Sequence, residues 1–267
     1  MRKFLASMLV CGGILLGSAS AAGPLVVNGT QMGAEAEAQI HANTTYVSIR
    51  AVGQQLRPDA AITWENGQAV VRTGDLELTA RPGANYIEAN GRTLHVPYGV
   101  RTAAGRVLVP VRVLAKAMGA QVDWNSTTGQ VTVTGGGAAE GGDSAYGEDD
   151  LYWLSRIVSA ESRGEPLEGQ IAVANVVLNR VKSSQFPNSI YDVIFDQKWG
   201  VQFTPVSNGT IYHAPTEQSV RAAQMALEGT NVVGDSLYFL APALSTNSWV
   251  MENRELVTVI GNHWFYR

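Results

Sequence analysis

Glu161 is the side chain in this sequence whose position most clearly suggests acid–base chemistry. The apolar residues Leu151, Leu154, Ile157 and Val158 have the spacing of one helical face, and that face continues to Glu161. A carboxyl group therefore stands where the pattern requires a core side chain. Because burial disfavours the charged form, we expect the pKa of Glu161 to be raised. A carboxylic acid that is still protonated near neutral pH could serve as the general acid in cleavage of a glycosidic bond.

Two helices are expected to position this carboxyl group. The first ends before Gly164 and Pro166, because Gly164 tolerates a left-handed turn and Pro166 disfavours a helical residue before it. The second runs from about Leu167 to Val181 and has an apolar stripe at Ile171, Ala174, Leu178 and Val181. Glu161 should thus lie at the corner between two helices. The spacing leaves open a structural alternative, in which Glu161 caps its helix or pairs with Arg163 or Arg180.

Length and composition favour two folded domains and exclude some partners. The chain has 267 residues, of which 45% are hydrophobic and 16% charged, and its net charge is −4. That length suffices for two cores, and the low charge density argues against a disordered chain. No basic stripe is present, so we expect no nucleic-acid partner.

The first 21 residues have the pattern of a secretory signal peptide. A basic start is followed by an apolar run from Phe4 to Leu16 and by small residues at Ala19 and Ala21. The run is shorter than the roughly 20 residues that a membrane-spanning helix needs, and no later stretch is apolar enough. The protein is therefore predicted to be secreted or held in the cell envelope, without a transmembrane segment after cleavage.

No metal or cofactor is expected from the sequence. The only cysteine, Cys11, lies inside the predicted signal peptide, so the mature chain would have no thiolate ligand. The four histidines are scattered without the spacing of metal ligands, at His41, His95, His213 and His263.

Residues 22–134 read as a duplicated, β-rich module. Asn28-Gly29 and Asn90-Gly91 lie 62 positions apart, as do Val47 and Val109, and Trp64 and Trp124 lie 60 apart. Each copy is expected to contain an Asn-Gly hairpin, a short helix (residues 50–56 and 112–118) and a second hairpin. We expect the two tryptophans to pack in the core at equivalent positions. The alternative is that their rings stack on sugars.

The second copy, NGRTLHVPYGVRTAAGRVLVPVRVLAKAMGAQVDWNSTTGQVTV, resembles the copper amine oxidase N-terminal-like domain. Nothing in the sequence supplies a copper site, and the pattern does not identify a ligand for this module. Residues 135–149 are rich in glycine and lack apolar periodicity, which is typical of a flexible linker between independently folded domains.

Residues 150–267 are expected to form a second domain with further helices and a small sheet. Tyr191–Phe195 is predicted as a short helix or turn, and Lys198–Gly209 as a hairpin or loop that lines a groove. A helix is expected over about Thr216–Glu228, because Thr216 is a good N-cap and Gly229 a good terminator. Ser236–Leu240 and Leu256–Ile260 are strand-like and are expected to pair with each other.

This second half resembles the SleB/CwlJ-type cell-wall hydrolases, the family of spore cortex-lytic enzymes. The resemblance begins with SAESRGEPLEGQIAVANVVLNRV and continues in order through the closing IGNHWFY. It implies a mainly helical, lysozyme-like domain with a small sheet, so the fold class expected for the chain is α+β with two domains. It also implies that Glu161 is the catalytic acid. The further residues expected to line the substrate cleft are Gln202, Phe203, Thr204 and Tyr238.

Two other positions bear on this site. Glu165 is the nearest second carboxylate, but the turn at Pro166 is expected to point it elsewhere, which makes it structural. The family usually has Asn-Pro after its Tyr-Phe pair, whereas here Ala241 precedes Pro242. If the family asparagine contacts substrate or holds the loop, Ala241 lacks that hydrogen-bonding group.

The resemblance implies cleavage of peptidoglycan glycan strands between N-acetylmuramic acid and N-acetylglucosamine. A hydrolysing glycosidase normally uses two carboxyl groups, whereas a single Glu161 fits a lytic transglycosylase, in which the 6-hydroxyl of the sugar replaces water. The alternatives are a true hydrolysing muramidase and a wall-binding protein without catalysis. The sequence leaves open whether the wall is spore cortex, attacked during germination, or vegetative. It names no protein partner.

Overall fold

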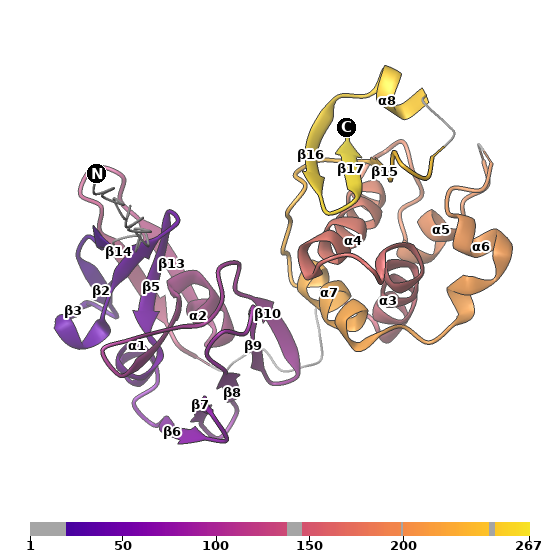
Figure 1. The fold of residues 1–267 in the computed structure, drawn as a ribbon. Helices are drawn as coiled ribbons and strands as arrows, with labels where there is room; N and C mark the ends of the chain where they lie inside the picture. Colours follow the sequence, from indigo (N-terminus) through magenta and orange to yellow (C-terminus); the bar gives the residue numbers. More distant parts are fainter. Residues whose placement is uncertain (1–19, 138–145, 199, 246–248) are drawn as a thin grey trace, which may run out of the picture.

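The computed structural model describes residues 20–137, 146–198, 200–245 and 249–267. Helices and sheets surround two hydrophobic cores, one drawn from residues between Leu25 and Val133 and the other from residues between Leu154 and Phe265. Figure 1 shows a β-rich N-terminal part in indigo to magenta and a mainly helical C-terminal part in salmon to yellow. The α+β class and the character of both halves are as predicted.

The predicted signal peptide falls mostly outside the described residues. Of residues 1–21 only Ser20 and Ala21 are described, and they form the short strand β1. None of the described helices is both long and apolar enough to cross a lipid bilayer.

The N-terminal part contains three sheets and two short α-helices. The strand orders are β1-β4-β5-β12-β11, β10-β9-β8-β7-β6 and β13-β14-β2-β3. The elements run in chain order as β1 (Ser20–Ala21), β2 (Leu25–Val27), β3 (Thr30–Gln31), η1 (Ala34–Ala36), β4 (Gln39–His41), β5 (Thr44–Ser48), α1 (Ile49–Leu56), β6 (Ala61–Glu65), β7 (Gln68–Arg72), β8 (Glu77–Ala80), β9 (Tyr86–Ala89), β10 (Arg92–His95), β11 (Arg101–Ala103), β12 (Arg106–Pro110), α2 (Val111–Ala117), β13 (Ala120–Trp124) and β14 (Val131–Gly135).

The strand register reproduces the duplication seen in the sequence. Strands β5 and β12 pair in antiparallel fashion at the centre of the first sheet, and Val47 lies opposite its own equivalent, Val109. The neighbouring pairs are symmetric about this point, so the two copies are related by an approximate twofold axis through it. Each copy continues from its central strand into a helix, α1 or α2, within one residue of the expected bounds.

Asn-Gly turns close the first hairpin of each copy. Asn28 and Gly29 have φ values of 48° and 79°, and Asn90 and Gly91 have 50° and 79°. A two-residue hairpin turn with both φ angles positive matches the twist of its strands, and asparagine and glycine adopt it most readily. The predicted turns are therefore confirmed. The copies differ at β8, which separates β7 from β9, whereas β14 pairs directly with β2.

The expectation that Trp64 and Trp124 pack in the core is wrong. Their exposed fractions are 57% and 59%. Both lie in strands, β6 and β13, that form the outer edge of their sheets. A strand at a sheet edge can leave a side chain open to solvent even where a strand pattern suggests burial.

The predicted Gly-rich linker, residues 135–149, lies in large part outside the described residues. Strand β14 extends to Gly135 and helix α3 begins at Glu148, while residues 138–145 lie outside the described residues. The N-terminus of α3 is fixed by Asp150, whose carboxylate accepts a hydrogen bond from the backbone N–H of Gly147 at 3.2 Å. Three acidic residues in its first turn also suit the positive end of the helix dipole.

The C-terminal part packs three longer helices under a three-stranded sheet. Helices α3, α4 and α7 contact one another, and Figure 1 shows the sheet lying at one end of them. The elements are α3 (Glu148–Ser162), α4 (Leu167–Lys182), α5 (Ile190–Phe195), α6 (Thr204–Asn208), η2 (Thr210–Tyr212), α7 (Glu217–Leu227), β15 (Tyr238–Leu240), α8 (Trp249–Asn253), β16 (Leu256–Ile260) and β17 (His263–Tyr266).

Most expected elements of this half are present, with two corrections. Helices α5 and α7 match their predicted ranges, and the Thr216 side chain caps α7 by accepting from the N–H of Ser219. Strands β15 and β16 do not pair with each other, because β17 lies between them. The segment expected to be a hairpin or loop contains helix α6, whose first turn tolerates Pro205, since the missing N–H needs no partner there.

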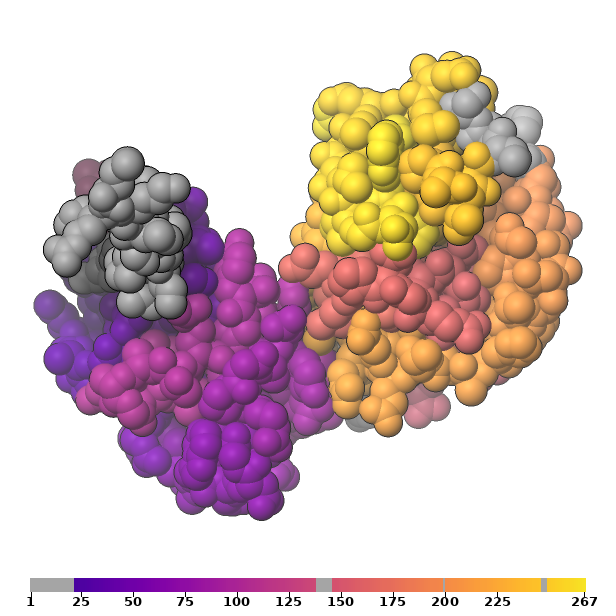
Figure 2. All heavy atoms as spheres, viewed as in Figure 1, coloured from indigo at the N-terminus to yellow at the C-terminus, as the bar shows by residue number. Residues whose placement is uncertain are grey.

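The two halves touch where β10 meets α7. The guanidinium of Arg92 donates two hydrogen bonds to the Glu228 carboxylate, at 2.9 and 2.8 Å, and both side chains are 5% exposed. Thr93 donates to Gln224 beside this pair. Figure 2 shows that the halves meet over a limited region and are otherwise separate. A buried ion pair therefore joins the two halves, for which the sequence predicted only a flexible linker.

Candidate active site

Glu161 lies in the last turn of α3, at the corner with α4. Helix α3 ends at Ser162, a turn follows at Arg163 and Gly164, and α4 begins at Leu167. The side chain is half-buried. The position expected from the helical spacing is therefore correct.

Burial raises the pKa of Glu161 to about 7. No hydrogen bond or ion pair to its carboxyl group is found within the described ranges. Arg180 donates from Nε to the backbone oxygen of Leu237 instead, and Arg163 is exposed. The alternative in which Glu161 pairs with one of these arginines is thus wrong. Near neutral pH the carboxyl group is partly protonated and can donate a proton.

Glu165 is held in a different environment, although it is only four residues away. Its carboxylate accepts two hydrogen bonds from Asn262, one from the backbone N–H to Oε2 and one from Nδ2 to Oε1, each 2.9 Å long. Burial alone would raise the pKa of Glu165, but these two bonds, together with nearby His263, lower it overall. Glu165 is therefore ionised at neutral pH, with its oxygens engaged.

These contacts make Glu165 a clamp between the helical corner and the sheet. Asn262 lies in the turn between β16 and β17, so the carboxylate ties this hairpin to the start of α4. A Cβ at Gly261 would collide with the carboxylate, which explains the glycine at this turn. The backbone oxygen of Glu165 also accepts from the side chains of Gln170 and Gln218. The structural role expected for Glu165 agrees with these contacts.

Tyr238 lies in β15, beside two arginines. Its hydroxyl accepts a hydrogen bond from Arg254 at 3.2 Å, and the guanidinium carbons of Arg254 and Arg180 lie 4.7 and 5.7 Å from its ring centroid. Arg180 is buried, and its Nη1 has no hydrogen-bond partner among the described residues. Burial lowers the pKa of Arg180 to about 10, so it remains positively charged.

The sequence suggested only one role for Arg180, that of a structural ion-pair partner of Glu161. Arg180 lies outside the apolar stripe of its helix, so periodicity predicted neither its burial nor its place beside Tyr238. The sequence signal is only its location within the resemblance that surrounds Glu161. The unpaired Nη1 atom is itself buried, so it has no contact with solvent in this structure.

The other three residues expected to line the cleft differ in their exposure to solvent. Phe203 is 2% exposed and packs in the C-terminal core beneath Arg180, so its side chain is not available to line an open cleft. Phe203 lies in a loop next to apolar helices, and its aromatic side chain is buried rather than exposed to solvent. Thr204 is exposed at the start of α6, and half-buried Gln202 donates to the backbone oxygen of Gly200. Among the described residues, no hydrogen bond joins Glu161 to any of these side chains or to Tyr238.

Ala241 lies at a tight turn after β15. Its backbone oxygen accepts hydrogen bonds from the N–H groups of Leu244 and Ser245, at 2.9 and 3.0 Å. The turn therefore forms through backbone groups, and the methyl side chain contributes no polar contact.

A cluster of aromatic side chains lies near the other end of α3. Trp153 packs edge-on against Tyr152, Tyr191 and Tyr212, with ring centroids 4.9, 5.3 and 6.2 Å away. All three tyrosines are exposed. Trp153 and Glu161 are eight residues apart on one helix, which places them about 12 Å apart along its axis. Sequence reasoning did not single out this patch, because its members come from three separate segments.

The described part of the chain contains no group of three or more His, Cys, Asp or Glu side chains that could hold a metal ion.

Comparison with known proteins finds a family model that matches part of each half. The cell wall hydrolase family matches residues 164–266, and the copper amine oxidase N-terminal domain matches residues 26–133. The first match begins three residues after Glu161, so the role of that residue depends on the local geometry and on the sequence around it.

Several spore cortex-lytic enzymes are similar to the C-terminal half. The enzyme of Bacillus cereus is 39% identical over 122 residues, which cover 46% of each chain. That of Oceanobacillus iheyensis is 34% identical over 150 residues, 52% of this chain and 53% of the relative. The chain thus spans about half the length of these curated relatives. A solved structure, the catalytic domain of the germination-specific lytic transglycosylase SleB from Bacillus anthracis, is 39% identical and matches over 46% of this chain and 98% of that one, with a TM-score of 0.43.

Proposed function

We propose, from the match of residues 164–266 to the cell wall hydrolase family, that this protein cleaves the glycan strands of peptidoglycan. The bond cut lies between N-acetylmuramic acid and N-acetylglucosamine, and the reaction is that of a lytic transglycosylase. The relatives are spore cortex-lytic enzymes, which favours a role in cortex lysis during germination. The protein acts outside the cytoplasm, after removal of residues 1–21, and needs no cofactor.

The observation that carries this proposal is the pair of carboxyl groups with opposite pKa shifts. The pKa of Glu161 is raised to about 7 by burial, whereas the pKa of Glu165 is lowered and both of its oxygens accept from Asn262. Opposite shifts of the pKa values of two neighbouring carboxyl groups indicate that the group with the raised pKa serves as the acid. Glu165 is not free to act as a nucleophile or to activate water. One residue, Glu161, therefore performs both proton transfers.

The reaction follows from that single group. Protonated Glu161 donates its proton to the glycosidic oxygen as the bond from C1 of the muramic acid to that oxygen breaks. The resulting carboxylate then removes the proton from the 6-hydroxyl of the same muramic acid, and the 6-oxygen bonds to C1 and closes an anhydro ring. Glu161 is protonated again at the end. No water is consumed, and no second carboxylate is required, in contrast to a hydrolysing glycosidase.

Several side chains of the C-terminal half are proposed to hold the glycan strand. Gln202, Thr204 and Tyr238 remain candidates for the cleft, while Phe203 supports it from the core. The exposed tyrosines around Trp153 offer faces on which sugar rings can stack.

Glu161→Gln tests the proposal, with Glu168→Gln as a matched control on the exposed start of α4. The first change preserves shape but removes the transferable proton, and general acid–base catalysis is worth roughly 10²–10⁴-fold. Clearing of a peptidoglycan suspension should fall at least that much in Glu161→Gln and stay near wild type in Glu168→Gln. Full activity in Glu161→Gln would reject Glu161 as the acid.

The products distinguish the remaining alternatives. Mass spectrometry of the soluble fragments should find anhydro-muramic ends, lighter by one water than reducing ends. Reducing ends throughout would indicate a hydrolysing muramidase and would overturn the single-residue mechanism. Binding to the wall without any soluble fragment would instead indicate a wall-binding protein.

A further inference from the structure

Two pockets in the N-terminal half are equivalent under its duplication. The first, here the Trp64 pocket, has a volume of about 540 Å³ and is lined by Ile49, Arg50, Ile62, Trp64 and Arg106, among others. The second, here the Trp124 pocket, has a volume of about 270 Å³ and includes Val111, Arg112, Val122, Trp124 and Thr44. Each named residue of the second pocket is the counterpart of one in the first, at an offset of 60 or 62 positions. The same cavity has therefore been built twice.

Each pocket combines both copies of the repeat. The helix and the edge hairpin come from one copy, whereas Arg106 or Thr44 comes from the central strand of the other. This follows from the antiparallel pairing of β5 with β12, which brings the start of each strand beside the helix of the opposite copy. The pockets thus depend on the duplicated fold and not on one loop.

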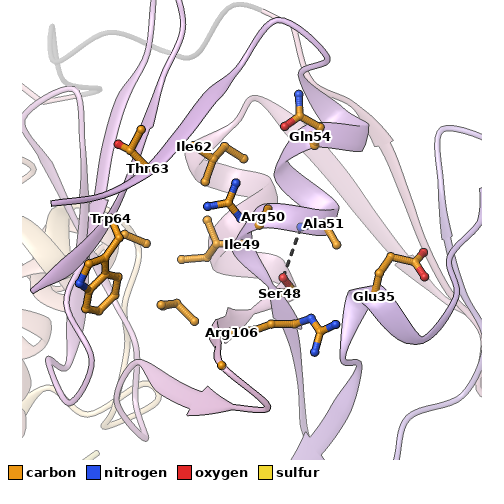
Figure 3. A pocket seen from close by; sticks show the side chains of 13 residues that line it. Glu35, Ser48, Ile49, Arg50, Ala51, Gln54, Ile62, Thr63, Trp64 and Arg106 are labelled. Carbon is orange, nitrogen blue, oxygen red and sulfur yellow. Dashed lines mark hydrogen bonds between the residues drawn. The ribbon is translucent and has the colours of Figure 1, made fainter.

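The tryptophan in each pocket is exposed and unpaired. Trp64 and Trp124 are each more than half exposed to solvent, and no hydrogen bond from either indole N–H is found among the described residues. Figure 3 shows Trp64 at one end of its pocket and Glu35 at the other, with Ile49, Arg50 and Arg106 between them. Two large apolar rings kept in solvent at equivalent positions are an energetic cost to a monomeric domain unless a ligand covers them.

An arginine lines each pocket together with the tryptophan. Arg50 is exposed and has no hydrogen bond or ion pair within the described ranges, and its counterpart Arg112 donates one bond, to the backbone oxygen of Val122 at 3.3 Å. The Trp64 pocket also holds Arg106 and Glu35, so each pocket carries one excess positive charge. A ligand that offers a carboxylate and hydroxyl or carbonyl oxygens complements these donors.

We propose that the two pockets bind strands of N-acetylated amino sugars that carry carboxylates, with one sugar ring stacked on Trp64 and another on Trp124. The C–H face of a pyranose ring is weakly positive and matches the negative face of an indole, while the arginine reaches the acetamido oxygen or the carboxylate. The choice of a wall glycan as the occupant rests on the function proposed for the C-terminal half. The Trp64 pocket, which has the larger volume, is the stronger of the two sites.

Single and double alanine variants of Trp64 and Trp124 test this proposal in the full chain. Tyr98→Ala is the matched control, because Tyr98 is an equally exposed aromatic of the same half and lines neither pocket. Binding is measured at 4 °C by pelleting with purified peptidoglycan and by calorimetry with peptide-free glycan strands. Chitin oligosaccharides supply the same ring without carboxylates, and cellulose is the negative probe. Release of fragments from short soluble glycans is measured in parallel.

Each single variant should weaken binding to the peptide-free strands about tenfold, and the double variant should weaken binding to intact wall by more than about 100-fold, since two sites act together. Cleavage of short soluble glycans should stay unchanged, and Arg50→Gln should reduce affinity for wall strands more than for chitin. Unchanged binding in the double variant, an equal loss in Tyr98→Ala, or binding to stem peptides alone would overturn the proposal. If the wild-type protein binds wall glycan but releases no fragments, the proposed function is rejected, whereas the proposal for these two binding sites is supported.

Discussion

Replacing Glu161 by glutamine should change the stability of the C-terminal half in a pH-dependent way. The pKa of this carboxyl group is about 7 in the folded chain, against 4.5 for an unperturbed glutamate. Between these values the folded state binds more protons than the unfolded state, so the free energy of unfolding falls as the pH rises. Below pH 4.5 the group is protonated in both states and has no effect.

The size of the effect follows from the two pKa values. One pKa unit corresponds to about 1.4 kcal/mol, so the free energy of unfolding of the wild-type chain should fall by about 3 kcal/mol between pH 4.5 and 7. The glutamine variant should not lose this stability. Relative to wild type, the free energy of unfolding of Glu161→Gln should therefore be higher by about 1 kcal/mol at pH 5 and by about 3 kcal/mol at pH 8.

Urea unfolding followed by circular dichroism, at pH 5 and pH 8, measures this difference. Glu165→Gln is the control, and its effect on stability should have the opposite sign. The pKa of Glu165 is lowered in the wild type, and its carboxylate accepts two hydrogen bonds from Asn262. That variant should be less stable than wild type at pH 8, by about 1–3 kcal/mol for a buried bond left unmade, and the gap should shrink as the pH falls below 4.5. A stability difference between wild type and Glu161→Gln that is the same at both pH values would refute the raised pKa.

Two further outcomes are expected from the same structure. Because the acid must be protonated, cleavage of soluble glycan should fall about tenfold for each pH unit above about 7, and a rate that stays flat to pH 9 would contradict Glu161 as the acid. The fragment from Ser144 to Arg267 should fold and keep measurable activity, because all buried residues of its core come from this half. Its stability should be lower than in the full chain, since Glu228 loses Arg92 and the core loses its contact with Tyr86. An unfolded fragment by circular dichroism would show that the halves are not independent.

The position of Glu161 could be read from the sequence because it depends on local rules. Helical spacing, the break at Gly164 and Pro166, and the cap at Thr216 are properties of neighbouring residues, and they placed α3, α4 and α7 within a few positions. The duplication was equally visible, because Asn-Gly turns and strand patterns recur at a fixed offset. These local signals placed the helices, the repeat and the carboxyl group of Glu161, whereas the fold class of the second half and the role of Glu161 as the acid were expected from the family resemblance.

Tertiary structure alone decided the features that join distant segments. Strand β17 enters between β15 and β16, Asn262 reaches Glu165 across 97 positions, and Arg180 is buried against the β15 region. The buried pair of Arg92 and Glu228 joins the halves across 136 positions. No local pattern encodes such pairings, because they depend on which surfaces meet after folding.

The same reason explains why the tryptophans were misjudged. A tryptophan in a strand has the same local pattern whether the strand is central or at an edge, and only the strand order placed β6 and β13 at edges. The repeat itself was in the sequence, but the pockets were not. They arise because β5 and β12 pair across the approximate twofold axis and bring each copy's helix beside the other copy's strand.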